Sequence, residues 1–184
     1  MRDCLLAVDL FSDFSHEDGD RLLASLRARC AGLAQAIEVA RSRSVPVVYA
    51  NDTHGVWNGD ARELVRRALH GPGGDVLARV APSEEDAFIV KPRYSAFDLT
   101  PLELVLAEHE TERLLLVGMT TEMCVAQTAI DARERNYKVS VITDACAAVD
   151  PELEQTALRY LEAVTGTWVV STIEEALAAP AFAS

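Results

Sequence analysis

The fold is decided by the stretch at residues 114–125, which reads LLLVGMTTEMCV. Its first residues form an apolar run that ends in Gly118, and such a run is typical of a strand buried on both faces of a parallel sheet. A helix is predicted over residues 123–135, so the chain passes from strand to helix within a few residues. Cys124 lies at the start of that helix, where unpaired N–H groups and the helix dipole favour a thiolate. A plain alternative is that Cys124 is one more small buried hydrophobic residue.

Strands and helices alternate on both sides of this stretch. Further strands are predicted at residues 4–9, 45–50, 87–90, 139–143 and 167–170. Helices are predicted at residues 19–42, 61–69, 100–109, 151–163 and 173–178. This alternation predicts an α/β fold, a three-layer, Rossmann-like, doubly wound and mainly parallel sheet of about six strands with helices on both faces. Without a linker or an internal repeat, residues 1–184 are expected to form a single domain.

Composition excludes several classes of partner. The net charge of −12 disfavours nucleic acid and anionic membranes, because both attract basic surfaces. No apolar stretch approaches the ~18 residues of a membrane span. The four cysteines form no C-x-x-C pair, so neither a zinc knuckle nor a dithiol redox site is signalled. Free thiols and the lack of a signal peptide predict a cytoplasmic protein.

Polar residues stand just past several predicted strands. They are Asp9, Asn51, Asp52, Lys91, Thr120 to Cys124, and Asp144. In doubly wound sheets ligands bind at the carboxyl ends of the strands, so these groups are expected on one rim. A carboxylate beside a thiol can take its proton, and a nearby ammonium keeps the carboxylate ionised. For Asp9 and Lys91 the alternative is a structural ion pair. No G-x-G-x-x-G or P-loop motif is present, and no cofactor is expected.

Three segments, in this order, carry a resemblance to a known family. They are Asp9 with Asp13-Phe14, KPRYSAF at 91–97, and GMTTEMCV at 118–125 running on through TAIDA at 128–132. Through them the chain resembles the isochorismatase-like cysteine hydrolase superfamily, which includes the nicotinamidases and the N-carbamoylsarcosine amidases. The stretch NDTHGVW at residues 51–57 also resembles a loop found in many members of this family. The resemblance spans almost the whole chain.

The resemblance implies a catalytic triad of Asp9, Lys91 and Cys124. It also implies a cis peptide bond between Met119 and Thr120, which turns a backbone N–H towards the site. The N–H groups of Thr120 and Cys124 would then receive the oxyanion.

The expected substrate pocket combines aromatic walls with one polar anchor, which suits a small, flat or partly apolar amide. Its residues are Phe14, Asn51, Trp57, Tyr94 and Phe97. Each aromatic residue has plain core packing as its alternative, Phe97 above all.

A metal is not expected. Asp52 and His54 match two ligands of the metal site that nicotinamidases carry, and His70 stands further on. The sequence around His70 does not match that of the third ligand, and two ligands bind a metal poorly.

The sequence therefore predicts a hydrolase that cleaves a small amide or ureido-type C–N bond through a thioester on Cys124. We also expect the pKa of Cys124 to lie below that of free cysteine. One alternative is isochorismatase-type vinyl-ether hydrolysis, which in the relatives does not rely on the cysteine. Another is a non-catalytic fold-mate that binds a partner protein. A small-molecule substrate is the expected partner, and since relatives are commonly dimers or tetramers, a homodimer or homotetramer is expected.

Overall fold

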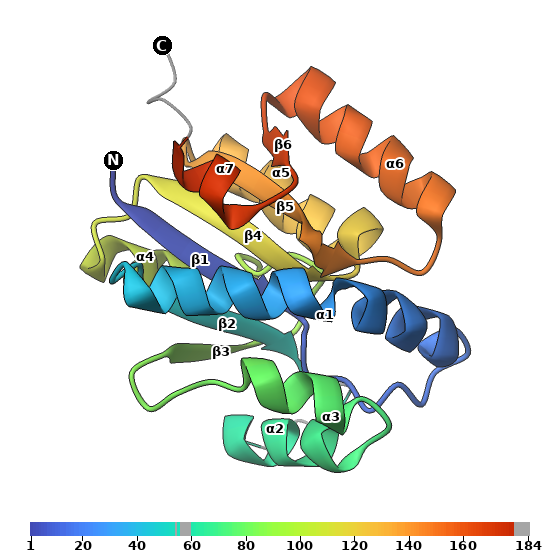
Figure 1. Ribbon diagram of the computed structural model, residues 1–184. Coiled ribbons are helices and arrows are strands. Elements are labelled where there is room, and N and C mark those ends of the chain that lie inside the picture. The colour runs from blue at the N-terminus through green and yellow to red at the C-terminus, as the bar shows by residue number, and fades with distance from the viewer. Residues whose placement is uncertain (54, 56–59, 179–184) are drawn as a thin grey trace.

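A parallel sheet of six strands runs through the part of the chain that the computed structural model describes, residues 1–53, 55 and 60–178 (Figure 1). Its strand order is β3-β2-β1-β4-β5-β6, and every neighbouring pair is parallel. The strands are β1 (Asp3–Val8), β2 (Val47–Asp52), β3 (Ala87–Lys91), β4 (Arg113–Met119), β5 (Lys138–Ala147) and β6 (Trp168–Val170). The predicted doubly wound sheet is confirmed.

Helices cover both faces of this sheet, as Figure 1 shows with α1 and α7 in front and α4 and α5 behind. The α-helices are α1 (Gly19–Ser42), α2 (Ala61–His70), α3 (Gly74–Leu77), α4 (Leu102–Glu108), α5 (Ala126–Glu134), α6 (Pro151–Tyr160) and α7 (Ile173–Ala178). Shorter helical turns are η1 (Ala78–Val80), η2 (Thr121–Val125) and η3 (Leu161–Thr165). No helix among the described residues is long and apolar enough to cross a membrane.

β4 lies at the centre of the sheet, and all seven of its residues are buried. Leu115 and Val117 pack into the core beneath α1, whereas Leu114 and Leu116 pack into the core on the side of α4 and α5. Successive side chains of a strand point to opposite faces, so a strand covered on both faces needs an apolar residue at every position. This requirement explains the unbroken run that begins at residue 114.

β5 departs from the prediction at its carboxyl end. It was expected to stop at Thr143 but runs on to Ala147, with a shift in its pairing to β4 after Val141. Asp144 therefore lies inside β5, where its N–H donates to the carbonyl of Ser171, and the residue is exposed. Its predicted place on the rim with the other polar residues is wrong, because a pairing irregularity leaves no trace in residue type.

Two helical features also escaped the sequence pattern. Between the helix predicted at residues 61–69 and the strand predicted at 87–90, no helix was predicted, but Gly74 begins the short helix α3. The helix expected from residue 123 begins at Thr121, and its first turn, η2, has π-helical geometry. Cys124 is thus the fourth residue of this wider turn rather than the second residue of an α-helix.

At Gly118, β4 has no room for a side chain against β1. A Cβ atom there would lie 2.0 Å from the carbonyl oxygen of Val8, and the residue has a φ of +123°. Glycine alone fits both the backbone angle and the contact. Val8 directly precedes Asp9, so this contact also limits how far Asp9 can lie from the segment that carries Cys124.

Gly118→Ala is expected to destabilise the fold by at least about 3 kcal/mol, since it adds a backbone clash to an unfavourable φ. Gly166→Ala is the matched control, because Gly166 also has a positive φ, +66°, but its nearest neighbour would be 3.5 Å away on the Arg133 side chain. The control should lose only about 1–2 kcal/mol. Urea denaturation measures both values, and equal losses would show that the contact with Val8 is unimportant.

Candidate active site

Three strand ends bring Asp9, Lys91 and Cys124 together. Asp9 follows β1, Lys91 ends β3, and Cys124 lies in η2, which follows β4 directly. The Nζ atom of Lys91 lies 2.6 Å from Oδ2 of Asp9, and the Cys124 thiol lies beside the same carboxylate, close enough to affect its pKa. β2 separates β3 from β1, so the lysine side chain reaches across the end of one strand to its partner. The peptide bond between Met119 and Thr120, at the start of the turn, is cis.

The Asp9 carboxylate is held from several sides. Its Oδ1 accepts a hydrogen bond of 2.7 Å from the backbone N–H of Asp52. Lys91 is fully buried, and its Nζ also donates to the carbonyl of Arg93 at 2.8 Å. Burial raises the pKa of Asp9 above its ordinary value, against the opposing effects of Lys91 and of the hydrogen bonds from Cys124 and Asp52. A carboxylate of raised pKa is a stronger base, which suits it to accept a thiol proton.

The Cys124 thiol has a pKa raised above that of free cysteine, first because it is largely buried and next because the Asp9 carboxylate lies beside it. Lys91 opposes this effect and does not overcome it. The expectation of a lowered pKa is therefore wrong. A helix N-terminus contributes about 0.3–1 kcal/mol, less than one pKa unit, and an adjacent carboxylate outweighs it. The surroundings of Cys124 thus favour its neutral thiol form beside Asp9.

Contacts made by backbone atoms complete the site, and sequence reasoning missed them. The N–H of Asp52 and the carbonyl of Arg93 bind the ion pair, but their side chains do not take part in these two bonds. No residue type signals such a contact. Only the register of β2 and β3, which pairs Asp52 with Lys91, would have pointed to it.

Asn51 does not serve as the polar anchor of a pocket. The residue is buried, its Oδ1 accepts from the N–H of Phe11 at 2.7 Å, and its Nδ2 donates to the carbonyl of Phe11 at 3.1 Å. The Asn51 side-chain amide thus satisfies both the N–H and the carbonyl of Phe11, as the backbone of a neighbouring strand would. Its role is to fix the loop that follows Asp9, and the predicted role in binding is corrected accordingly.

Phe14 and Phe97 belong to the core rather than to a pocket wall. Phe14 is 6% exposed, and its ring packs so close to Gly73 that a Cβ there would lie 2.5 Å from it. Phe97 is 5% exposed, with its ring 5.9 Å from that of Tyr137 and beneath the guanidinium of Arg135. Both were predicted to be pocket walls, with core packing as the alternative, and their side chains point into the packed layers.

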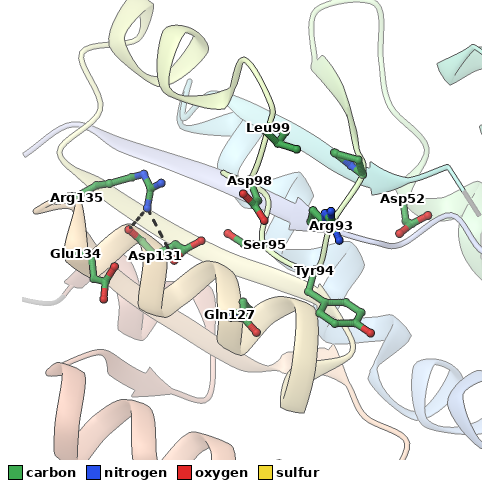
Figure 2. Close-up of a pocket in the computed structure, with 11 residues that line it drawn as sticks. Asp52, Arg93, Tyr94, Ser95, Asp98, Leu99, Gln127, Asp131, Glu134 and Arg135 are labelled. Carbon is green, nitrogen blue, oxygen red and sulfur yellow. Dashed lines mark hydrogen bonds and ion pairs between the residues drawn. The ribbon is translucent and has the colours of Figure 1, made fainter. Parts of the chain in front are cut away.

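Tyr94 lies at the surface and is 58% exposed. It borders a groove of about 760 Å³ between the loop after β3 and α5, and Figure 2 shows Tyr94, Arg93 and Asp52 along one end of it. Asp52 lines the groove, and its N–H donates to Asp9. The groove therefore lies next to Asp9, Lys91 and Cys124, and none of these three residues lines it. The other two predicted residues, Trp57 and His54, lie outside the described residues.

No group of three or more His, Cys, Asp or Glu side chains within residues 1–53, 55 and 60–178 is arranged to hold a metal. His70, in α2, directs its Nδ1 to the carbonyl of Arg66 at 2.7 Å.

Comparison with known proteins assigns the chain to a family. The sequence profile described as the isochorismatase domain matches residues 3–174. The chain belongs to the isochorismatase family, the isochorismatase-like hydrolases.

Individual relatives are similar over most of their length. The ureidoacrylate amidohydrolase RutB of Methylorubrum extorquens is 37% identical over 94% of this chain and 82% of that protein. A probable inactive nicotinamidase of Arabidopsis thaliana is 32% identical over 81% of this chain and 82% of that protein. The crystal structure of N-carbamoylsarcosine amidase from Thermoplasma acidophilum superposes with a TM-score of 0.70 and 27% identity, covering 93% of this chain and 96% of that one.

The electrostatics of the site predict how the thiol of Cys124 responds to pH. Its reaction with iodoacetamide should reach half of its maximal rate above the pH of about 8.5 that is typical of free cysteine. Asp9→Asn removes the neighbouring negative charge, so the thiolate forms more readily and the midpoint should move to lower pH. The rate is measured from pH 6 to 11 at a temperature below unfolding.

Cys124→Ser is the control, because it gives the background from the other three thiols, which are buried. A wild-type midpoint below that of free cysteine, or one that Asp9→Asn leaves in place, would contradict this account of the site.

Proposed function

We propose that this protein is a cysteine-dependent hydrolase that cleaves a small amide or ureido-type C–N bond through a thioester intermediate. One observation carries the proposal: the Cys124 thiol lies beside the Asp9 carboxylate, close enough for each group to shift the pKa of the other, and Lys91 holds that carboxylate at 2.6 Å. A nucleophile within hydrogen-bond reach of a base, with the base oriented by a third group, is the arrangement that activates a thiol.

Acylation begins when the sulfur of Cys124 attacks the carbonyl carbon of the substrate. As the C–S bond forms, the thiol proton passes to Asp9, and the carbonyl oxygen gains negative charge. We assign this oxyanion to the N–H groups of Thr120 and Cys124, because the N–H groups of Met123 and Val125 already bind the carbonyl of Thr120. The C–N bond then breaks, and the nitrogen takes the proton from Asp9 and leaves as an amine or as ammonia.

Deacylation uses the same groups in the reverse sense. Asp9, again a carboxylate, accepts a proton from a water molecule, whose oxygen attacks the thioester carbon. The C–S bond breaks, the acid is released, and the proton on Asp9 returns to the sulfur. Lys91 remains positively charged throughout in this scheme and limits the electrostatic cost of moving one proton back and forth.

The bond type rests on the relatives. The names of RutB and of N-carbamoylsarcosine amidase both describe cleavage of a ureido or carbamoyl group, and both proteins match more than nine-tenths of this chain. A ureido carbonyl is a weak electrophile, which suits a site that supplies both a nucleophile and a fixed base. We propose a small molecule of this class as the substrate.

A second candidate function is a fold-mate that binds without catalysis, since one relative is described as a probable inactive nicotinamidase. The arrangement of Asp9, Lys91 and Cys124 argues against a role in binding alone. Lys91 is a fully buried ammonium beside a carboxylate, and a buried ion pair contributes little net stability compared with apolar packing. A protein that only binds a partner has no need for this pair in contact with a thiol.

The proposal is tested by ammonia release from a panel of simple amides, ureas and N-carbamoyl amino acids, with isochorismate alongside. Wild-type protein should release ammonia from at least one member, and Cys124→Ala should be slower by about 10³-fold or more, since the nucleophile is lost. Cys124→Ser tests whether a hydroxyl of higher pKa can substitute.

Three results would count against the proposal. Equal release by wild type and Cys124→Ala excludes the thioester route. Turnover of isochorismate that survives in Cys124→Ala indicates vinyl-ether hydrolysis. Absence of turnover across the panel, together with a thiol that iodoacetamide does not modify, indicates the non-catalytic fold-mate.

A further inference from the structure

The turn that carries Cys124 is held in place by the segment after β5. The first residue of η2, Thr121, is fully buried. Its Oγ1 lies 3.2 Å from the carbonyl oxygen of Ala147, at the end of β5, and 2.9 Å from Oε1 of Glu154 in α6. The hydroxyl thus joins the turn both to the sheet and to the helix packed beside it.

Glu122, the next residue, binds the same segment from the other side. Its Oε1 accepts hydrogen bonds from the backbone N–H groups of Val149, at 2.8 Å, and Asp150, at 3.3 Å. These two N–H groups stand at the amino end of α6, which begins at Pro151. A carboxylate at a helix amino end is favourably placed with respect to the helix dipole. Two successive residues of η2 therefore anchor the turn to one helix.

Glu154 is itself held by a contact with α1. The residue is only 8% exposed, its Oε2 lies 3.4 Å from Nη2 of Arg29 in α1, and Nη1 of Arg29 binds the carbonyl of Thr143. A chain of contacts thus runs from α1 on one face of the sheet, past the end of β5, to the turn that bears the nucleophile. Neither Glu154 nor Arg29 has a part in the proposed chemistry.

Cys124 needs such support because its thiol must meet a carboxylate that another strand presents. Asp9 is fixed at the end of β1, whereas the thiol sits on a π-helical turn, a geometry that is rare and seldom longer than one turn. A displacement of about 1 Å at a reacting group can lower the rate by about 10²-fold. The turn must therefore be held from outside.

We propose that Thr121, Glu122 and Glu154 are positioning residues that hold η2 so that the Cys124 thiol stays on Asp9. We call these three residues the turn clamp. This inference rests on the proposed function for its effect on turnover, but it makes a separate statement about the thiol that needs no substrate.

Two matched pairs of variants test the turn clamp. Thr121→Val keeps the shape of the side chain and removes its hydroxyl, whereas Thr121→Ser keeps the hydroxyl. Glu122→Met removes the acceptor for Val149 and Asp150, whereas Glu122→Gln keeps an oxygen that can accept. The second pair provides the answer if Thr121→Val does not fold.

We expect Thr121→Val and Glu122→Met to lower kcat by about 10- to 100-fold with KM changed by less than about twofold, because the reacting atoms and not the bound substrate are displaced. Thr121→Ser and Glu122→Gln should stay within about threefold of wild type. In the two impaired variants the midpoint of the iodoacetamide profile should move towards that of free cysteine, because the thiol no longer meets Asp9.

Melting temperatures separate positioning from mere stabilisation. If Thr121→Val and Glu122→Met lower the melting temperature but leave both kcat and the thiol profile at wild-type values, the turn clamp is only structural and the inference is overturned. If no substrate of the panel is turned over, the proposed function fails, and the thiol profile alone then supports or overturns the turn clamp.

Discussion

The ion pair between Lys91 and Asp9 is the interaction on which the rest of the site depends. An ammonium group without solvent contact stays charged only if its surroundings supply negative charge and hydrogen-bond acceptors. Here Asp9 and the carbonyl of Arg93 supply them, and the N–H of Asp52 satisfies the second carboxylate oxygen. These contacts fix three consecutive strand ends relative to one another. The Cys124 thiol therefore lies beside a carboxylate whose position these contacts already determine.

The architecture was predictable because it follows from burial. A strand covered on both faces must be apolar at every position, so the apolar run at residues 114–117 indicated the central strand of the sheet. The helix predicted at residues 19–42 is α1, with the same bounds. Asp9 and Lys91 were found for a similar reason, since the ends of parallel strands share one edge. What the sequence does not encode in residue type is local irregularity. A shift in strand pairing moves Asp144 away from the predicted rim, and η2 is a π-helical turn where the pattern predicts an ordinary helix start.

The errors within the site have a common physical cause. Asn51, Phe14 and Phe97 stand near residues of the candidate site in the chain, but the direction of a side chain depends on the loop conformation, which pattern alone does not give. The pKa of Cys124 was misjudged because the helix end was weighed without the carboxylate that binds the thiol. In both cases a contact between distant segments decides the outcome, and the turn clamp, which joins η2 to α6, is of the same kind.

The position of β3 at one edge of the sheet has a consequence for how the protein loses function. Within the described part of the chain β3 pairs with β2 alone, and edge elements of this kind open at a lower free-energy cost than the central strands that define global stability. Lys91 is the last residue of β3, so each local opening of that strand withdraws the ammonium from Asp9 while β1, β4 and the cores on both faces persist. Under the proposed mechanism, turnover and global stability thus depend on different parts of the sheet, and amide hydrogen exchange along β3 reports how often the pair between Lys91 and Asp9 opens.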